Sequence, residues 1–113
     1  EKGVNLCFST DAPATSWAVP SDPFPCIKGA VTRKAYDGTD CGQDQAVDIE
    51  TAVKLYTKAS AGVAGFKNIG QLRAGYQADF IVLCDDLLSV PSEEIDKVCV
   101  AATYVGGEKV YEK

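Results

Sequence analysis

In the first part of the chain, apolar and polar side chains first alternate, and further on the apolar side chains recur at helical spacing. Residues 3–9 alternate apolar with small or polar side chains, which predicts a strand that ends just before Asp11. Residues 12–25 are rich in proline and serine, so we expect an ordered loop without regular backbone pairing. Apolar residues then recur at helical spacing over 26–33, and this stretch predicts a short helix.

The longest apolar stripe begins after Asp48 and predicts the clearest helix of the chain. Asp is a favourable N-cap residue, and apolar side chains follow it at helical spacing as far as Val63. We expect this helix to end near Gly62 or Gly65, because glycine readily adopts the left-handed conformation of a C-cap.

The pattern changes period after this helix. Residues 80–84 form a continuous apolar run, which is typical of a strand buried on both faces. Residues 92–95 suit one or two helical turns, and the glycines at 106–107 predict a hairpin between strands 98–105 and 108–111. This order indicates an α/β fold, with the last unit of an α/β barrel followed by a small, separate sheet.

Length and charge exclude several classes of protein. The 113 residues allow one compact unit of domain size. A net charge of −5 argues against nucleic acid or an anionic membrane as a partner. No charge-free stretch approaches the roughly 20 apolar residues of a membrane helix. Since the chain has no histidine, it cannot supply a Ser-His-Asp triad or an HExxH zinc site by itself.

The five cysteines form neither a CxxC pair nor an even set. This usage favours reduced thiols and a cytoplasmic location over a disulfide framework. Several of the cysteines lie in apolar runs, where cysteine acts as a small hydrophobic residue. The chain also lacks methionine, so we expect it to be a piece of a longer polypeptide.

Three passages of the chain form a recognisable series. The first joins VNLCFSTDAP at 4–13 to PFPCIKGAVTR at 23–33, and the second is AVKLYTKASAGVAG at 52–65. The third and most specific is IGQLRAGYQADFIVL at 69–83, followed by TYVGGEKVY at 103–111. In this order they resemble the C-terminal part of the metal-dependent amidohydrolases, in particular amidohydrolase family 3, whose members share a GxLxxGxxADFVVL passage.

The resemblance implies an α/β fragment in two parts. Residues 1–67 would supply the last strand, the long loop and the closing helices of a TIM-like barrel. Residues 68–113 would form part of a small β-sandwich. The full-length enzyme would hold a divalent metal, with zinc as the expected ion, through histidines and a carboxylated lysine or acid that this chain lacks. The resemblance therefore implies no tightly bound metal in the fragment. It also implies two partners, the rest of the parent chain and a small amide-type substrate.

Asp11 is the candidate for both metal binding and catalysis. A carboxylate at the C-terminal mouth of a barrel strand can bind a cation and accept a proton from an attacking water. From the residues alone, an Asx turn or a cap before Pro13 is the more frequent role of such an aspartate. The resemblance favours the catalytic role.

Trp17, Phe24 and Arg33 are the candidates for substrate binding. The two aromatic residues follow Asp11, where they would either line a pocket or hold the loop. Arg33 would pair with a substrate carboxylate or, in the interpretation we favour, with an acid that holds the long loop. Asp79 is expected to hold the turn before its strand through backbone N–H groups.

Two functions are compatible with these observations. The first is the C-terminal portion of a metal-dependent hydrolase of carbon–nitrogen bonds other than peptide bonds, inactive as an isolated fragment. The alternative is a noncatalytic regulatory or interaction module, because some relatives carry the label exoenzyme regulatory protein. In both cases, unpaired strand edges and apolar faces predict that the fragment associates with itself.

Overall fold

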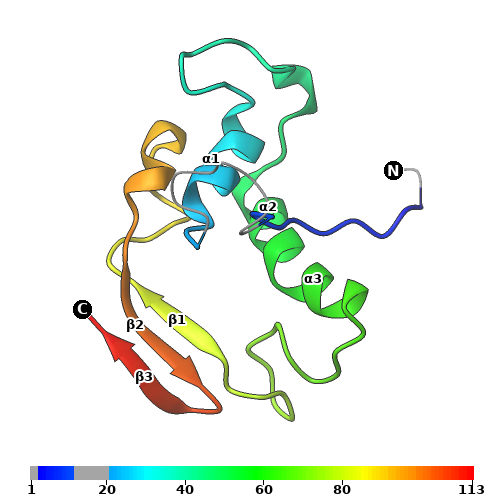
Figure 1. Cartoon of the computed structure of the whole chain (residues 1–113), viewed down its shortest axis with the longest axis vertical. Coiled ribbons are helices and arrows are strands. Elements are labelled where there is room, and N and C mark those ends of the chain that lie inside the picture. Colours follow the sequence, from blue (N-terminus) through cyan, green and yellow to red (C-terminus); the bar gives the residue numbers. More distant parts are fainter. Residues whose placement is uncertain (1–2, 12–20) are drawn as a thin grey trace.

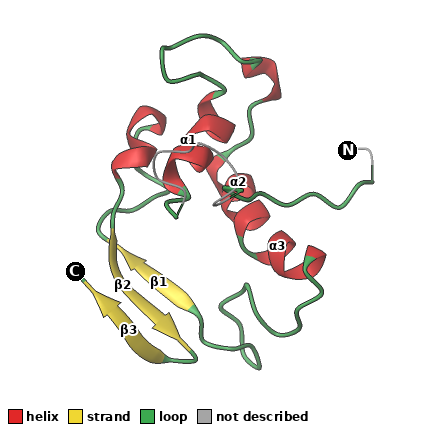
Figure 2. Cartoon of the chain, in the orientation of Figure 1, coloured by secondary structure: helices red, strands yellow, loops and turns green. Residues whose placement is uncertain are grey.

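The computed structural model describes residues 3–11 and 21–113 of the chain. In these residues, helices gather at one end and an antiparallel sheet lies at the other (Figure 1). Long loops connect the two ends (Figure 2). The elements, in order, are α1 (Phe24–Thr32), the 3₁₀ helix η1 (Gln43–Gln45), α2 (Ile49–Tyr56), α3 (Lys58–Val63), β1 (Phe80–Leu83), the 3₁₀ helix η2 (Ser92–Lys97), β2 (Val100–Val105) and β3 (Glu108–Glu112).

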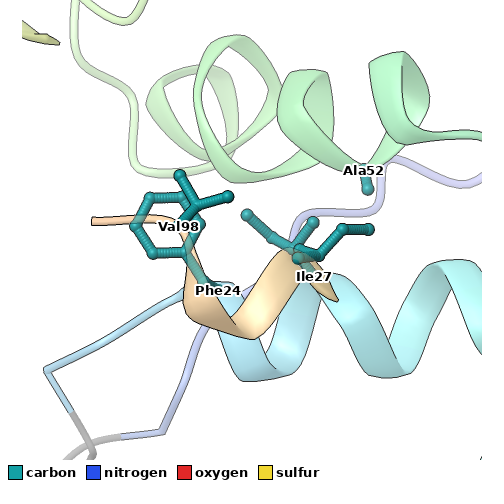
Figure 3. Packing of buried hydrophobic residues seen from close by; sticks show 5 residues of the cluster. Phe24, Ile27, Ala52 and Val98 are labelled. Carbon is teal, nitrogen blue, oxygen red and sulfur yellow. The ribbon is translucent and has the colours of Figure 1, made fainter. Parts of the chain in front are cut away.

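The hydrophobic core lies where α1 meets α2 and η2. Phe24 and Ile27 of α1 pack with Ala52 of α2 and with Val98, which follows η2 (Figure 3). Ile95 of η2 completes this cluster and is only 1% exposed. Helix α1 therefore joins the helical end of the chain to the segment that leads into the sheet.

The short helix predicted over 26–33 is confirmed as α1, with a start at Phe24. The earlier start is possible because Pro25 occupies the first turn, where its missing N–H would have no intrahelical partner. The helix ends at Arg33, which is left-handed with a φ of 50° and donates its backbone N–H to the Gly29 carbonyl.

The N-cap predicted at Asp48 is confirmed. Its carboxylate accepts a hydrogen bond of 2.8 Å from the Thr51 backbone N–H. This bond, together with a second one from the Thr51 hydroxyl, holds the pKa of Asp48 below its ordinary value. The cap therefore satisfies one of the N–H groups that the first turn of a helix leaves without a partner.

The helix predicted to end near Gly62 or Gly65 does end there, because α3 stops at Val63, but it is not continuous. The chain breaks at Thr57, whose φ of −112° and ψ of −86° separate α2 from α3. Gly70, from a loop further along the chain, lies against this break with a φ of 77°. The interruption thus coincides with a tertiary contact, which the helical spacing of the sequence does not encode.

We expect Gly70→Ala to destabilise the fold by about 2–4 kcal/mol, from backbone strain and steric conflict together. A Cβ at this position would lie 2.8 Å from the Ala61 Cβ and 2.9 Å from the Thr57 carbonyl oxygen. Gly75→Ala is the matched control, since Gly75 has a φ of 85° but nothing within 4 Å of the added carbon. Urea unfolding of both variants separates the two contributions, and equal losses would refute the steric part.

The strand predicted over residues 3–9 is not formed within the described part of the chain. A strand needs a neighbour to accept its ladder of hydrogen bonds, and no described strand lies beside this segment. The segment is held instead by a hydrogen bond from the Phe8 N–H to the Leu55 carbonyl of α2. The last unit of a barrel is therefore not seen in this chain and stays a prediction.

The sheet is three-stranded and antiparallel, in the order β1-β2-β3. The hairpin predicted around 106–107 is confirmed, and so is a separate sheet in the last forty residues. The prediction that residues 80–84 are buried on both faces is wrong, because Ile81 and Val82 of β1 are 47% and 45% exposed. Strand β1 has one described neighbour, β2, so one of its edges and part of its surface remain uncovered.

Asp79 has the structural role that the sequence predicted, at a different turn. Its carboxylate accepts a hydrogen bond of 2.8 Å from the backbone N–H of Gly106 in the β2–β3 turn. The next residue of that turn, Gly107, donates its N–H to the Ala78 carbonyl. The residues that precede β1 therefore hold the hairpin in place.

The expectation of reduced thiols is wrong for one pair of cysteines. Cys84 and Cys99 form a disulfide, with their Cα atoms 5.4 Å apart. Cys7, Cys26 and Cys41 are free. The cytoplasmic location stays a prediction and now rests on these three residues. Among the described residues, no helix has the length and apolar character that crossing a bilayer requires.

Candidate functional site at the end of the N-terminal segment

Asp11 lies exposed at the end of segment 3–11. Its backbone is left-handed, with a φ of 55°, and its N–H donates a hydrogen bond of 3.2 Å to the Ser9 hydroxyl. Asp tolerates this conformation better than most residues do. Asp11 is neither part of the core nor the start of a helix, and the chain that leads to it follows no ladder.

Phe8 anchors the segment three residues before Asp11. Its N–H donates a 3.1 Å hydrogen bond to the Leu55 carbonyl, and its ring meets the Tyr56 ring edge-on, with 5.8 Å between centroids. The Ser60 hydroxyl donates to the same carbonyl, at 2.8 Å. The break between α2 and α3 thus provides a carbonyl that fixes where the segment crosses the helices.

The ring of Tyr56 packs against Phe8. Its hydroxyl is buried and has no hydrogen-bond partner among the described residues. Burial, and after it the neighbouring Cys26, raise the pKa of Tyr56 above its ordinary value. Segment 3–11 therefore has an aromatic anchor at Phe8 and an exposed carboxylate at Asp11.

Two grooves lie on the described surface, and Asp11 lines neither of them. One, of about 470 Å³, separates Val4 and Leu6 from helices α2 and α3. The other, of about 680 Å³, lies between α1 and η2. It contains two ion pairs, Lys28 with Asp96 at 3.1 Å and Lys34 with Glu93 at 2.6 Å. These pairs satisfy the charges of the second groove internally.

The other candidate residues are not gathered around Asp11. Phe24 is 4% exposed and belongs to the core. The Arg33 guanidinium donates to the backbone carbonyls of Cys41, at 2.6 Å, and Gly42, at 3.4 Å. It therefore holds the loop after α1 through carbonyls, and no acid pairs with it in the described structure. Trp17 lies outside the described residues. Substrate contact by these three residues stays a prediction.

No group of three or more His, Cys, Asp or Glu side chains gathers among residues 3–11 and 21–113. The sequence contains no histidine, the most frequent nitrogen ligand of zinc. Metal binding by Asp11 therefore stays a prediction.

Phe8 holds segment 3–11 against the helices, a role that the sequence did not predict for it. The signal was present in the alternation of Val4, Leu6 and Phe8, which marks one face of the segment for packing. That face meets the helices only in part, because Val4 and Leu6 line the groove against α2 and α3 but are 78% and 58% exposed. What the alternation did not reveal is that the neighbour is a pair of helices and not a strand.

Comparison with known proteins identifies the family. The model of the Amidohydrolase family matches residues 1–111. The chain belongs to the amidohydrolase family. Residues 4–13 and 69–83, on which the resemblance rested, both lie within the matched range.

Two curated relatives of this amidohydrolase chain cover nearly all of it. "Putative amidohydrolase YtcJ" of Bacillus subtilis (strain 168) is 33% identical over 99% of the chain and 21% of its own length. "N-substituted formamide deformylase" of Arthrobacter pascens is 28% identical over 100% of the chain and 20% of its own length. The chain therefore spans about a fifth of the length of these relatives. No solved structure matches it.

Proposed function

We propose that this amidohydrolase chain is the C-terminal portion of a metal-dependent hydrolase that cleaves carbon–nitrogen bonds other than peptide bonds. The observation that carries the proposal is the family match, which extends over residues 1–111. The name of the Arthrobacter relative refers to N-substituted formamides. We take these compounds, and amides of similar size, as the substrate class to test first.

Asp11 is the catalytic residue of this proposal. Among the described residues, no side chain donates a hydrogen bond to its carboxylate and no lysine or arginine pairs with it. An exposed carboxylate without partners can bind a cation and take a proton from a water that attacks a carbonyl carbon. A divalent metal, when bound in the complete protein, would supply the activation of that water. Asp11 would then donate this proton to the leaving nitrogen.

The proposal divides the chain into two parts. In the proposal, residues 1–67 close the barrel and residues 68–113 belong to a β-sandwich. Segment 3–11 pairs with no strand here, and β1 and β3 each have one free edge in the described structure. These edges are where further strands of a longer polypeptide would add. By itself, the 113-residue chain is expected to hydrolyse nothing and to associate through the same edges.

The test uses the polypeptide that the complete gene encodes. We expect it to hydrolyse N-substituted formamides, to lose at least about 90% of that activity on removal of metal by a chelator, and to regain it with Zn²⁺. Elemental analysis before and after chelation verifies the removal. Full activity in the metal-free protein would refute metal dependence. Absence of any hydrolysis by the metal-loaded protein would favour the noncatalytic regulatory or interaction module.

A further inference from the structure

The Cys84–Cys99 disulfide lies where the sheet joins the helical core. Cys84 follows β1 directly, and Cys99 is the residue before β2. The Cys84 N–H also donates to the Cys99 carbonyl, at 2.9 Å. The disulfide therefore extends the pairing of β1 with β2 past the irregularity between Val82 and Leu83.

The residues on either side of the disulfide pack into the core. Leu83 and Val100 lie against the cluster formed by α1, α2 and η2, and Val98 belongs to that cluster with 5% exposure. The covalent bond thus ties the end of β1 to the segment that follows η2. Without it, this junction would be held by the pairing of β1 with β2, the backbone hydrogen bond at Cys84 and the packing of Leu83 and Val100.

The two sulfurs differ in their surroundings. Cys84 is exposed, whereas Cys99 is half-buried. The Lys113 ammonium lies 3.2 Å from the Cys99 sulfur. In the described structure Lys113 has no carboxylate within 4.0 Å, and the Cys99 sulfur is the side-chain atom with which its ammonium group interacts. An adjacent cation stabilises a thiolate, and a stabilised thiolate is the better leaving group in thiol–disulfide exchange.

We propose that this disulfide is a site of thiol–disulfide exchange with a dithiol reductant, with Cys84 as the sulfur attacked and Cys99 as the leaving group. The reductant's thiolate forms a bond to the Cys84 sulfur, and the bond between Cys84 and Cys99 breaks. Cys99 departs as a thiolate beside the Lys113 ammonium. The second thiolate of the reductant then attacks the reductant sulfur that is bonded to Cys84. This step releases the Cys84 thiolate, which takes up a proton. Two electrons pass to the protein, and the dithiol becomes a disulfide.

Reduction has a structural consequence that does not depend on the hydrolase proposal. It opens the loop that the disulfide closes between Cys84 and Cys99, which are 15 positions apart in the sequence. The unfolded chain gains conformational freedom, and the junction at Leu83 loses its covalent link. We expect the midpoint of thermal unfolding to fall by about 5–15 °C when the disulfide is reduced. Cys84→Ser and Cys99→Ser should each reproduce this fall.

The experiment measures how fast dithiothreitol reduces the native protein. Free thiols are first blocked with iodoacetamide, and new thiols are then captured with an isotopically heavy form of the reagent and mapped by mass spectrometry. We expect Lys113→Ala to slow reduction by about threefold and Lys113→Arg to restore the rate. Lys109→Ala is the matched control, because Lys109 pairs with Glu112 instead of a sulfur.

Trapping identifies the sulfur that is attacked. Native protein treated with glutathione and heavy iodoacetamide should carry glutathione on Cys84 and the alkyl group on Cys99. The reverse labelling, or equal rates for Lys113→Ala and Lys109→Ala, would overturn the assignment of the leaving group. Protein that yields both cysteines as free thiols before any reductant is added, or that is reduced only after unfolding in urea, would overturn the proposal as a whole.

Discussion

Asp11→Asn is expected to lower the turnover number of the complete hydrolase by about a hundredfold or more. The amide of asparagine has the size of the carboxylate but cannot accept a proton at neutral pH and binds cations weakly. Proton transfer by a positioned side chain contributes roughly 10²–10⁴ to catalytic rates. The side chain is exposed and carries no hydrogen bond among the described residues, so the substitution should leave the stability of the protein unchanged.

Kinetics, metal content and stability together test this expectation. Turnover number and KM are measured for Asp11→Asn with the metal content quantified, so that loss of metal is separated from loss of the proton acceptor. Asp85→Asn is the matched control, because Asp85 is also exposed and accepts no hydrogen bond in the described structure. A turnover number near wild type for Asp11→Asn would reassign Asp11 to the turn that it forms with Ser9.

Features of the fold with a local cause could be predicted from the sequence. The cap at Asp48 requires only the Thr51 N–H three residues away. The hairpin at 106–107 is marked by two adjacent glycines, and the contacts of its turn with Ala78 and Asp79 add to this local signal. The helix break at Thr57 and the missing strand at 3–9 have distant causes. Gly70 lies against the break, and a strand needs a neighbour that the described residues do not place beside 3–9. Helical or alternating patterns alone carry neither piece of information.

The candidate site, like the fold, could be predicted from the sequence only in part. The position of Asp11 at the end of an alternating segment could be predicted from residues 3–9. The packing of that segment could not, since Phe8 contacts Tyr56 whereas Val4 and Leu6 are 78% and 58% exposed. The pairing of Cys84 with Cys99 could not be read from five cysteines without a CxxC spacing, because it results from the register of β1 against β2. A count of cysteines identifies disulfides only where they form a dense framework.

Phe24→Ala is expected to destabilise the fold by about 3–5 kcal/mol, which is comparable to the whole stability of a small domain. The ring is 4% exposed and packs with Ile27, Ala52, Ile95 and Val98 at the junction of α1, α2 and η2 (Figure 3). Its removal leaves a cavity that rigid neighbours from three elements cannot fill. Phe24→Leu retains most of the volume and should cost about 1–2 kcal/mol.

Urea unfolding of the two variants decides between a core and a pocket role for Phe24. Phe66→Ala is the matched control, because Phe66 is 64% exposed and its loss should change the free energy of unfolding by no more than about 0.5 kcal/mol. If Phe24 lines a substrate pocket instead, Phe24→Ala should keep its stability, while the complete enzyme shows a higher KM. Because the described side chain lies inside the cluster, we expect loss of stability in Phe24→Ala and an unchanged KM in the folded Phe24→Leu enzyme.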